Sequence, residues 1–150
     1  MSIREEIDEA RRRLGLSTDE ITEVPEGEAR PLTSEFLSHF TGGVDSRWWW
    51  ERFTLPDAAY RFEDGKGFTH ITTLVPDAHE RIWFVAEDDQ LPYFPVYDAT
   101  PAVAQRIIGE CYGFEYYLIA KDLSWLLCEN HHDMVIAVGS VRQRLEQYGA

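Results

Sequence analysis

The residues best suited to chemistry lie together in one short segment, 128–133. It reads Cys-Glu-Asn-His-His-Asp and supplies a thiol, two imidazoles and two carboxylates within six residues. These groups are ordinary ligands of zinc or iron, so His131, His132 and Asp133 form a candidate metal site. The two histidines together with Glu115 also form a candidate general acid–base set.

The alternation of side chains along a strand argues against a shared metal site in this segment. Neighbouring residues on a strand point to opposite faces, so Cys128 and Glu129 do not readily reach one ion. Neither histidine has the i, i+4 helical partner of common zinc motifs. We therefore expect no metal and no cofactor, with Asn130 and Asp133 forming a tight turn that exposes both histidines.

A second chemical candidate is Glu115, which is followed by Tyr116 and Tyr117. A carboxylate beside phenols can act as a base with a shifted pKa. Alternation places Glu115 and Tyr117 on one face of the predicted strand. The interpretation we prefer is a polar outer face, or a buried acid that hydrogen-bonds to a neighbouring Tyr or His.

Aromatic side chains in an acidic chain favour a third interpretation, a protein-binding surface. Trp48, Trp49 and Trp50 are consecutive, so a strand through them must leave at least one of the three partly exposed. Tryptophan and tyrosine supply much of the binding energy at protein interfaces. The residues of the candidate binding surface are Trp48, Trp49, Trp50, Glu115, Tyr117, Glu129, Asn130, His131, His132 and Asp133.

The net charge of the chain indicates which kind of partner it favours. Its 14 Lys and Arg against 27 Asp and Glu give a net charge of −13, and residues 82–139 contain only two basic side chains, Arg106 and Lys121. Nucleic-acid binding depends on clustered basic residues, so we expect no nucleic acid among the ligands. The acidic field favours a basic protein partner.

Nothing in the sequence predicts association with a membrane. The segment Met1–Arg4 leads directly into an amphipathic pattern without an apolar signal-peptide region, and no stretch approaches the roughly 20 apolar residues of a membrane span. The chain has only two cysteines, Cys111 and Cys128, which is typical of a reducing compartment. We expect a cytoplasmic protein.

A length of 150 residues and a hydrophobic content of 44% predict one domain over residues 1–150, which starts with a capped helix. Ser2 and Glu5 form a capping box for a helix over 2–14, and Gly15 stops it. Residues 16–31 are polar and predict a loop. The α+β core is expected over 32–150.

Within that core, three further helices are predicted at 33–42, 100–113 and 141–148. Apolar runs predict strands at 48–53, 81–87, 93–97, 114–120, 125–129 and 134–138, the last two joined as a hairpin. Residues 56–67 are expected to form a loop, and 68–74 fit either a helical turn or a strand. The fold class is therefore α+β, with an antiparallel or mixed sheet of five or six strands and helices packed mainly on one face.

Several sequence blocks resemble a bacterial family of small proteins of unknown function. The blocks are Trp-Trp-Trp-Glu at 48–51, Phe-Glu-Tyr-Tyr at 114–117, the run 122–133 that ends in Glu-Asn-His-His-Asp, and Ala-Val-Gly at 137–139. The resemblance spans residues 48–139 and implies a bacterial origin without implying an activity. Size, acidity and layout are also similar to immunity proteins of the SUKH superfamily, which neutralise basic toxins.

Two functional hypotheses follow from the sequence. The first is a protein-binding module of the immunity type that recognises a basic partner. The alternative is a metal-dependent or general acid–base enzyme centred on residues 128–133. An enzyme requires histidine and carboxylate side chains that converge in a concave pocket, whereas a binding module can present them on an open surface.

Overall fold

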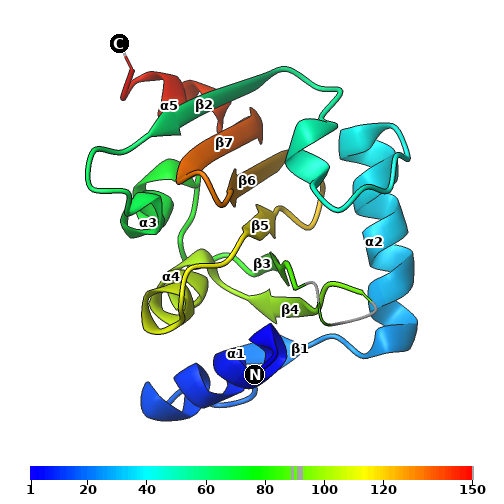
Figure 1. The fold of residues 1–150 in the computed structure, drawn as a ribbon, viewed down its shortest axis with the longest axis vertical. Coiled ribbons are helices and arrows are strands. Elements are labelled where there is room, and N and C mark those ends of the chain that lie inside the picture. Colours follow the sequence, from blue (N-terminus) through cyan, green and yellow to red (C-terminus); the bar gives the residue numbers. More distant parts are fainter. Residues whose placement is uncertain (89, 91–92, 150) are drawn as a thin grey trace.

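The computed structural model describes residues 1–88, 90 and 93–149 (Figure 1). The described part of the chain forms one antiparallel sheet of seven strands, so the α+β class is confirmed, whereas the predicted count of five or six strands is too low. In spatial order the strands are β1 (Ile21–Glu23), β4 (Val96–Ala99), β3 (Ile82–Ala86), β5 (Tyr116–Ile119), β6 (Trp125–Glu129), β7 (Met134–Gly139) and β2 (Asp57–Arg61).

Helices cover both faces of this sheet, and apolar side chains from each face form a separate core cluster. The α4 face carries α1 (Ile3–Arg13), α3 (Ile71–Leu74), α4 (Pro101–Glu110) and α5 (Arg142–Glu146). The α2 face carries α2 (Glu26–Thr41) and the 3₁₀ helix η1 (Trp49–Glu51). Figure 1 shows α2 along one side of the sheet, opposite α3 and α4. The expectation that helices lie mainly on one face therefore holds for four of the five α-helices described.

The two helices with clear capping signals form where the sequence predicts them. The Ser2 hydroxyl accepts a hydrogen bond from the N–H of Glu5 at 3.3 Å and starts α1. The Thr100 hydroxyl accepts from the N–H of Val103 at 3.2 Å, ahead of Pro101 at the first turn of α4. These local bonds satisfy backbone donors that no helix can satisfy internally, which is why capping can be read from sequence.

The predicted hairpin is also confirmed. Strands β6 and β7 pair antiparallel from Trp125 opposite Gly139 to Glu129 opposite Val135. Gly139 closes the far end with a φ of +79°, and a Cβ there would lie 2.4 Å from the carbonyl oxygen of Ser124. Only glycine fits such a close approach between backbones.

The loop predicted over residues 16–31 is wrong. It contains the edge strand β1, and α2 begins at Glu26 instead of Thr33 or Ser34. Pro31 lies inside α2 and lacks the N–H that would bond the carbonyl of Gly27, a residue exposed to water. Burial of Ala29 on the same stripe as Phe36 and Phe40 favours the longer helix despite this lost hydrogen bond.

The strand predicted over residues 48–53 and the loop over 56–67 are wrong as well. Residues 49–51 form η1, which turns Trp49 into the core, where its ring lies 4.8 Å from that of Tyr117. The adjoining edge strand β2 begins at Asp57. The undecided segment 68–74 is helical, as the end of the 3₁₀ helix η2 (Gly67–His70) followed by α3.

The strand predicted at 93–97 is displaced along the chain, because β4 starts at Val96, directly after Pro95. Proline has no N–H to donate to a sheet ladder, and here its carbonyl accepts from the N–H of Ala86 at the strand entrance. Across the residues described, no helix has the length and apolar character needed to cross a membrane.

Candidate functional site

The turn between β6 and β7 presents two histidines at one end of the sheet. The side-chain oxygen of Asn130 accepts hydrogen bonds from the N–H groups of His132 and Met134 at 2.9 and 3.1 Å. Asp133 has a φ of +59°, a conformation that aspartate tolerates better than most residues. Asn130 and Asp133 therefore form the turn as expected, and both His131 and His132 are exposed.

Beneath this turn lies Glu115, a buried carboxylate whose side chain is only 4% exposed. Its Oε2 accepts from the backbone N–H of His131 at 2.8 Å and from Nε1 of Trp50 at 3.1 Å. Nδ1 of His131 lies 2.6 Å from the same oxygen, within hydrogen-bond distance. Glu115 thus ties the hairpin to η1.

Glu115 also retains an unused acceptor. Its Oε1 is buried and has no hydrogen-bond partner among the residues described. Buried polar atoms without a partner are uncommon in folded proteins. The carboxylate therefore makes all of its hydrogen bonds, to Trp50 and His131, through Oε2.

Two of the three consecutive tryptophans reach the surface around this carboxylate. The ring of His131 lies 5.7 Å from that of Trp48 and 5.9 Å from that of Trp50. The ring of His132 lies 4.0 Å from His131 and 6.0 Å from Trp50. We call Trp48, Trp50, His131 and His132 the aromatic–histidine surface. Trp48 and Trp50 are partly exposed, as predicted, although the cause is a 3₁₀ turn and not the alternation of a strand.

The remaining aromatic candidates lie beneath this surface and are inaccessible. Trp49 is 3% exposed and packs between Tyr117 and Phe94. Tyr117 is 1% exposed, and its hydroxyl accepts from the backbone N–H of Trp50 at 3.3 Å. Burial raises the pKa of the Tyr117 phenol, so it stays neutral. Both residues support the surface without forming part of it.

The second carboxylate of the predicted site, Glu129, points to the α4 face. The Tyr116 hydroxyl donates to its Oε1 at 2.9 Å, and burial raises the pKa of Glu129. Glu129 lines a cavity of about 300 Å³ together with Phe68, Asp133 and His131. Cys128 points to the opposite, α2 face, as alternation predicts, and burial raises the pKa of its thiol.

The arrangement does not gather the ligands that a metal site needs. Over residues 1–88, 90 and 93–149, no three His, Cys, Asp or Glu side chains converge in a way that holds an ion. Nδ1 of His131 is hydrogen-bonded to Glu115. What the structure assembles is a carboxylate–imidazole pair within an aromatic surface.

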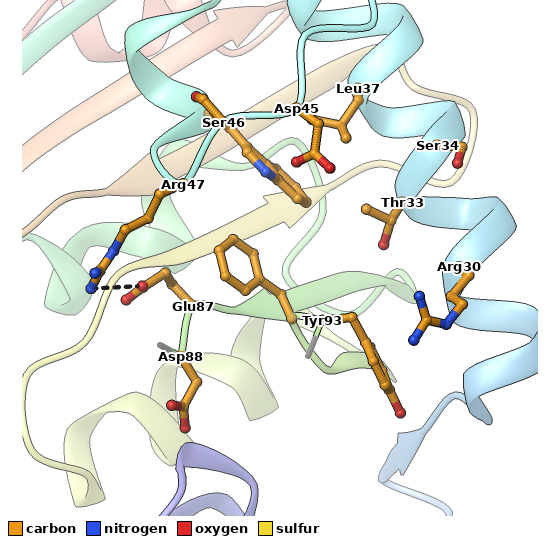
Figure 2. A pocket seen from close by; sticks show the side chains of 12 residues that line it. Arg30, Thr33, Ser34, Leu37, Asp45, Ser46, Arg47, Glu87, Asp88 and Tyr93 are labelled. Carbon is orange, nitrogen blue, oxygen red and sulfur yellow. Dashed lines mark ion pairs between the residues drawn. The ribbon is translucent and has the colours of Figure 1, made fainter. Parts of the chain in front are cut away.

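A cavity that sequence reasoning missed lies between α2 and the chain that leads into η1. It has a volume of about 510 Å³ and is lined by Arg30 and Thr33 of α2 together with Arg47, Tyr93 and Phe94 (Figure 2). The Arg30 guanidinium lies 5.0 Å from the ring centre of Tyr93. Figure 2 also shows Arg47 paired with Glu87, at 3.3 Å. The sequence carries no local signal for this cavity, because its lining comes from α2, the chain before η1 and the segment between β3 and β4.

The chain belongs to DUF6756, a family of unknown function whose sequence model matches residues 1–149. The resemblance to a family of unknown function is thus confirmed, and the match extends well beyond residues 48–139. No curated protein and no solved structure matches the chain.

Proposed function

We propose that this protein is a protein-binding module that docks a basic partner on the aromatic–histidine surface. The observation that carries the proposal is the partial exposure of Trp48 and Trp50 beside two exposed histidines. Large rings at the centre of an interface contribute more binding energy than the charged residues at its rim. The net charge of −13 favours a basic partner by accelerating encounter at low salt.

Preorganisation of the surface supports the same proposal. Glu115 holds Trp50 and His131 through hydrogen bonds of 2.6 to 3.1 Å, so these side chains have little freedom left to lose on binding. Trp48 is held by ring contact with His131 and by the Arg47 guanidinium, 5.5 Å from its ring centre. Restricting side chains before association raises affinity because less conformational entropy is lost.

The size, acidity and α+β layout favour an immunity-type role, in which the partner is a basic toxin and the protein acts in the bacterial cytoplasm. Such a role requires binding and no chemistry of its own. It is consistent with an open surface of rings and imidazoles in an acidic protein. The proposal involves no nucleic acid, no membrane and no cofactor.

The test is affinity capture from the native bacterium at about 0.05 and 0.5 M salt, followed by titration calorimetry with the purified captured protein. We expect a basic protein that binds more weakly at high salt, because exposed charges are screened. Trp48→Ala or Trp50→Ala should weaken the Kd by roughly 30-fold, about 2 kcal/mol.

The matched control is Trp83→Ala. Trp83 is a partly buried residue of β3 that lies outside the aromatic–histidine surface, and the Nζ atom of Lys121 lies 4.5 Å from its ring centre. This variant should bind like the wild type. The proposal would be contradicted if no basic protein is captured, or if neither Trp48→Ala nor Trp50→Ala changes the Kd.

A second candidate function, general acid–base catalysis, is favoured by one specific observation. A carboxylate bonded to Nδ1 at 2.6 Å orients an imidazole and leaves Nε2 available as a base. The His131 side chain is 47% exposed, so Nε2 can meet a substrate. If this candidate is correct, hydrolysis of p-nitrophenyl acetate exceeds the buffer rate and falls at least about 100-fold in His131→Gln. A wild-type rate equal to that of buffer rejects it.

A further inference from the structure

Strand β2 is the outermost strand at one end of the sheet, and α5 packs against it on the α4 face. It pairs with β7 over all five of its residues, from Asp57 opposite Val138 to Arg61 opposite Met134. In the described part of the chain no strand pairs with its other side, and Figure 1 shows β2 outermost at one end of the sheet. A free strand edge offers N–H and C=O groups to another strand.

The opposite edge of the sheet is less suited to pairing. Strand β1 has only three residues, Ile21–Glu23. An ion pair between Arg4 of α1 and Glu23, at 3.0 Å, lies against it. Short, covered edges resist strand addition, so β2 is the edge to consider.

The sequence of β2, Asp-Ala-Ala-Tyr-Arg, complements itself when it is read against a reversed copy. In an antiparallel pair centred on Ala59, Asp57 of each copy lies opposite Arg61 of the other. Ala58 then lies opposite Tyr60, a small residue against a large one. Opposite charges and matched sizes at directly facing positions are the pairs that stabilise antiparallel sheets.

The side chains needed for this match are available. Asp57, Ala59 and Arg61 are exposed and alternate with the half-buried Ala58 and Tyr60. Within the residues described, neither Asp57 nor Arg61 forms an ion pair or a side-chain hydrogen bond. A strand that pairs only with β7 therefore carries two opposite charges that its own chain leaves uncompensated.

We propose that β2 is a homodimerisation edge, where two copies of this chain pair antiparallel about Ala59 and form one continuous sheet. The two-fold axis passes through the Ala59 pair, and the interface contains two Asp57–Arg61 ion pairs. Such an interface is isologous, because each copy contributes the same residues. The partner is a second copy, because the charges and side-chain sizes of β2 match those of its own reversed sequence. The register is centred on Ala59, since shifting the strands by two residues in either direction loses both ion pairs.

This proposal is independent of the basic partner, because β2 and the aromatic–histidine surface share no residue. The long-range repulsion between two acidic copies acts against dimerisation at low salt. At about 0.15 M salt the screening length is near 8 Å, which removes most of that repulsion while directly facing charges still interact.

The test is sedimentation equilibrium at about 0.15 M salt over a wide concentration range. The wild type should dimerise, and Asp57→Arg and Arg61→Asp should each weaken the dimer at least tenfold by placing like charges opposite one another. An equimolar mixture of the two variants should restore association as a heterodimer, because every facing pair is then opposite in charge. The double variant Asp57→Arg, Arg61→Asp should also restore it.

The matched control is Glu63→Arg, which reverses an exposed charge just beyond the strand and should dimerise at least as well as the wild type. The mixing experiment uses the same two chains that fail alone, so a folding defect does not imitate its result. A monomeric wild type, single variants that dimerise normally, or a mixture that stays monomeric would each overturn the proposal.

Discussion

Glu115 and Glu129 are buried carboxylates at the same end of the sheet, yet they lie on opposite faces and have different partners. Glu115, on the α2 face, accepts from an indole, a backbone amide and an imidazole that can carry positive charge. Glu129, on the α4 face, accepts from the neutral Tyr116 hydroxyl, and nearby Asp133 adds a like charge. The partner set, more than burial alone, decides what a buried acid can do.

Glu115 fixes the positions of residues at the surface, whereas Glu129 bonds to a core residue on the α4 face. Glu115 joins distant segments, because Trp50, 65 positions away, and His131, 16 positions away, bond the same oxygen. Glu129 bonds across to Tyr116, its direct neighbour in the sheet register. Substitutions at the two sites should therefore have different consequences.

The largest effect is expected from Glu115→Ala. Removing the carboxylate leaves the Trp50 indole and the His131 amide without an acceptor in a buried site, which costs about 2–4 kcal/mol in the free energy of unfolding. Urea denaturation measures this change. Glu115→Gln keeps one oxygen for the same donors and should cost less than about 1 kcal/mol. Equal losses in both variants would show that the charge, and not the hydrogen bonds, is what stabilises.

On the other face, Gly67→Ala should cost about 1–3 kcal/mol. A Cβ at this position would lie 2.3 Å from Cγ2 of Val135 and 3.1 Å from Oε2 of Glu129. The control is Gly113→Ala, whose Cβ would meet nothing within 4 Å. Thermal denaturation of the two variants compares them directly, and similar melting temperatures would contradict the close packing around Glu129.

The pH dependence of stability reports on Glu129. Burial raises the pKa of Glu129 above 4.5, so the folded protein keeps this proton to a higher pH than the unfolded chain. The contribution of Glu129 to stability is thus fully present below pH about 4.5 and declines as pH rises through its folded pKa. Relative to Glu129→Gln, the wild type should lose stability over this range in chemical denaturation. A relative gain with rising pH would reverse the assignment.

The smallest effect is expected from His131→Ala. The imidazole is 47% exposed, so its bond to Glu115 competes with water and should contribute less than about 1 kcal/mol to stability. The backbone N–H of residue 131 still bonds the carboxylate. A loss above about 2 kcal/mol in urea denaturation would show that the imidazole itself, and not Trp50 and the backbone, holds Glu115.

Local signals in the sequence were sufficient for α1, α4 and the β6–β7 hairpin. Each depends on residues close together in the chain: a capping hydroxyl, a proline at the first turn, or turn-forming Asn130 and Asp133 between two apolar runs. The exposure of both histidines follows from the same turn. Such interactions are decided within a few residues, so the sequence predicts them without knowledge of the rest of the fold.

Contacts between distant segments decided the rest. Residues 49–51 form a 3₁₀ helix instead of the predicted strand because Trp49 packs against Tyr117. Helix α2 continues through Pro31 because its apolar stripe packs on the sheet. The hydrogen bond between Trp50 and Glu115 joins residues 65 positions apart in the chain, so no local sequence pattern predicts it. Burial of large rings contributes more free energy than local propensity, so the tertiary structure determined which tryptophans are exposed and which acid holds them.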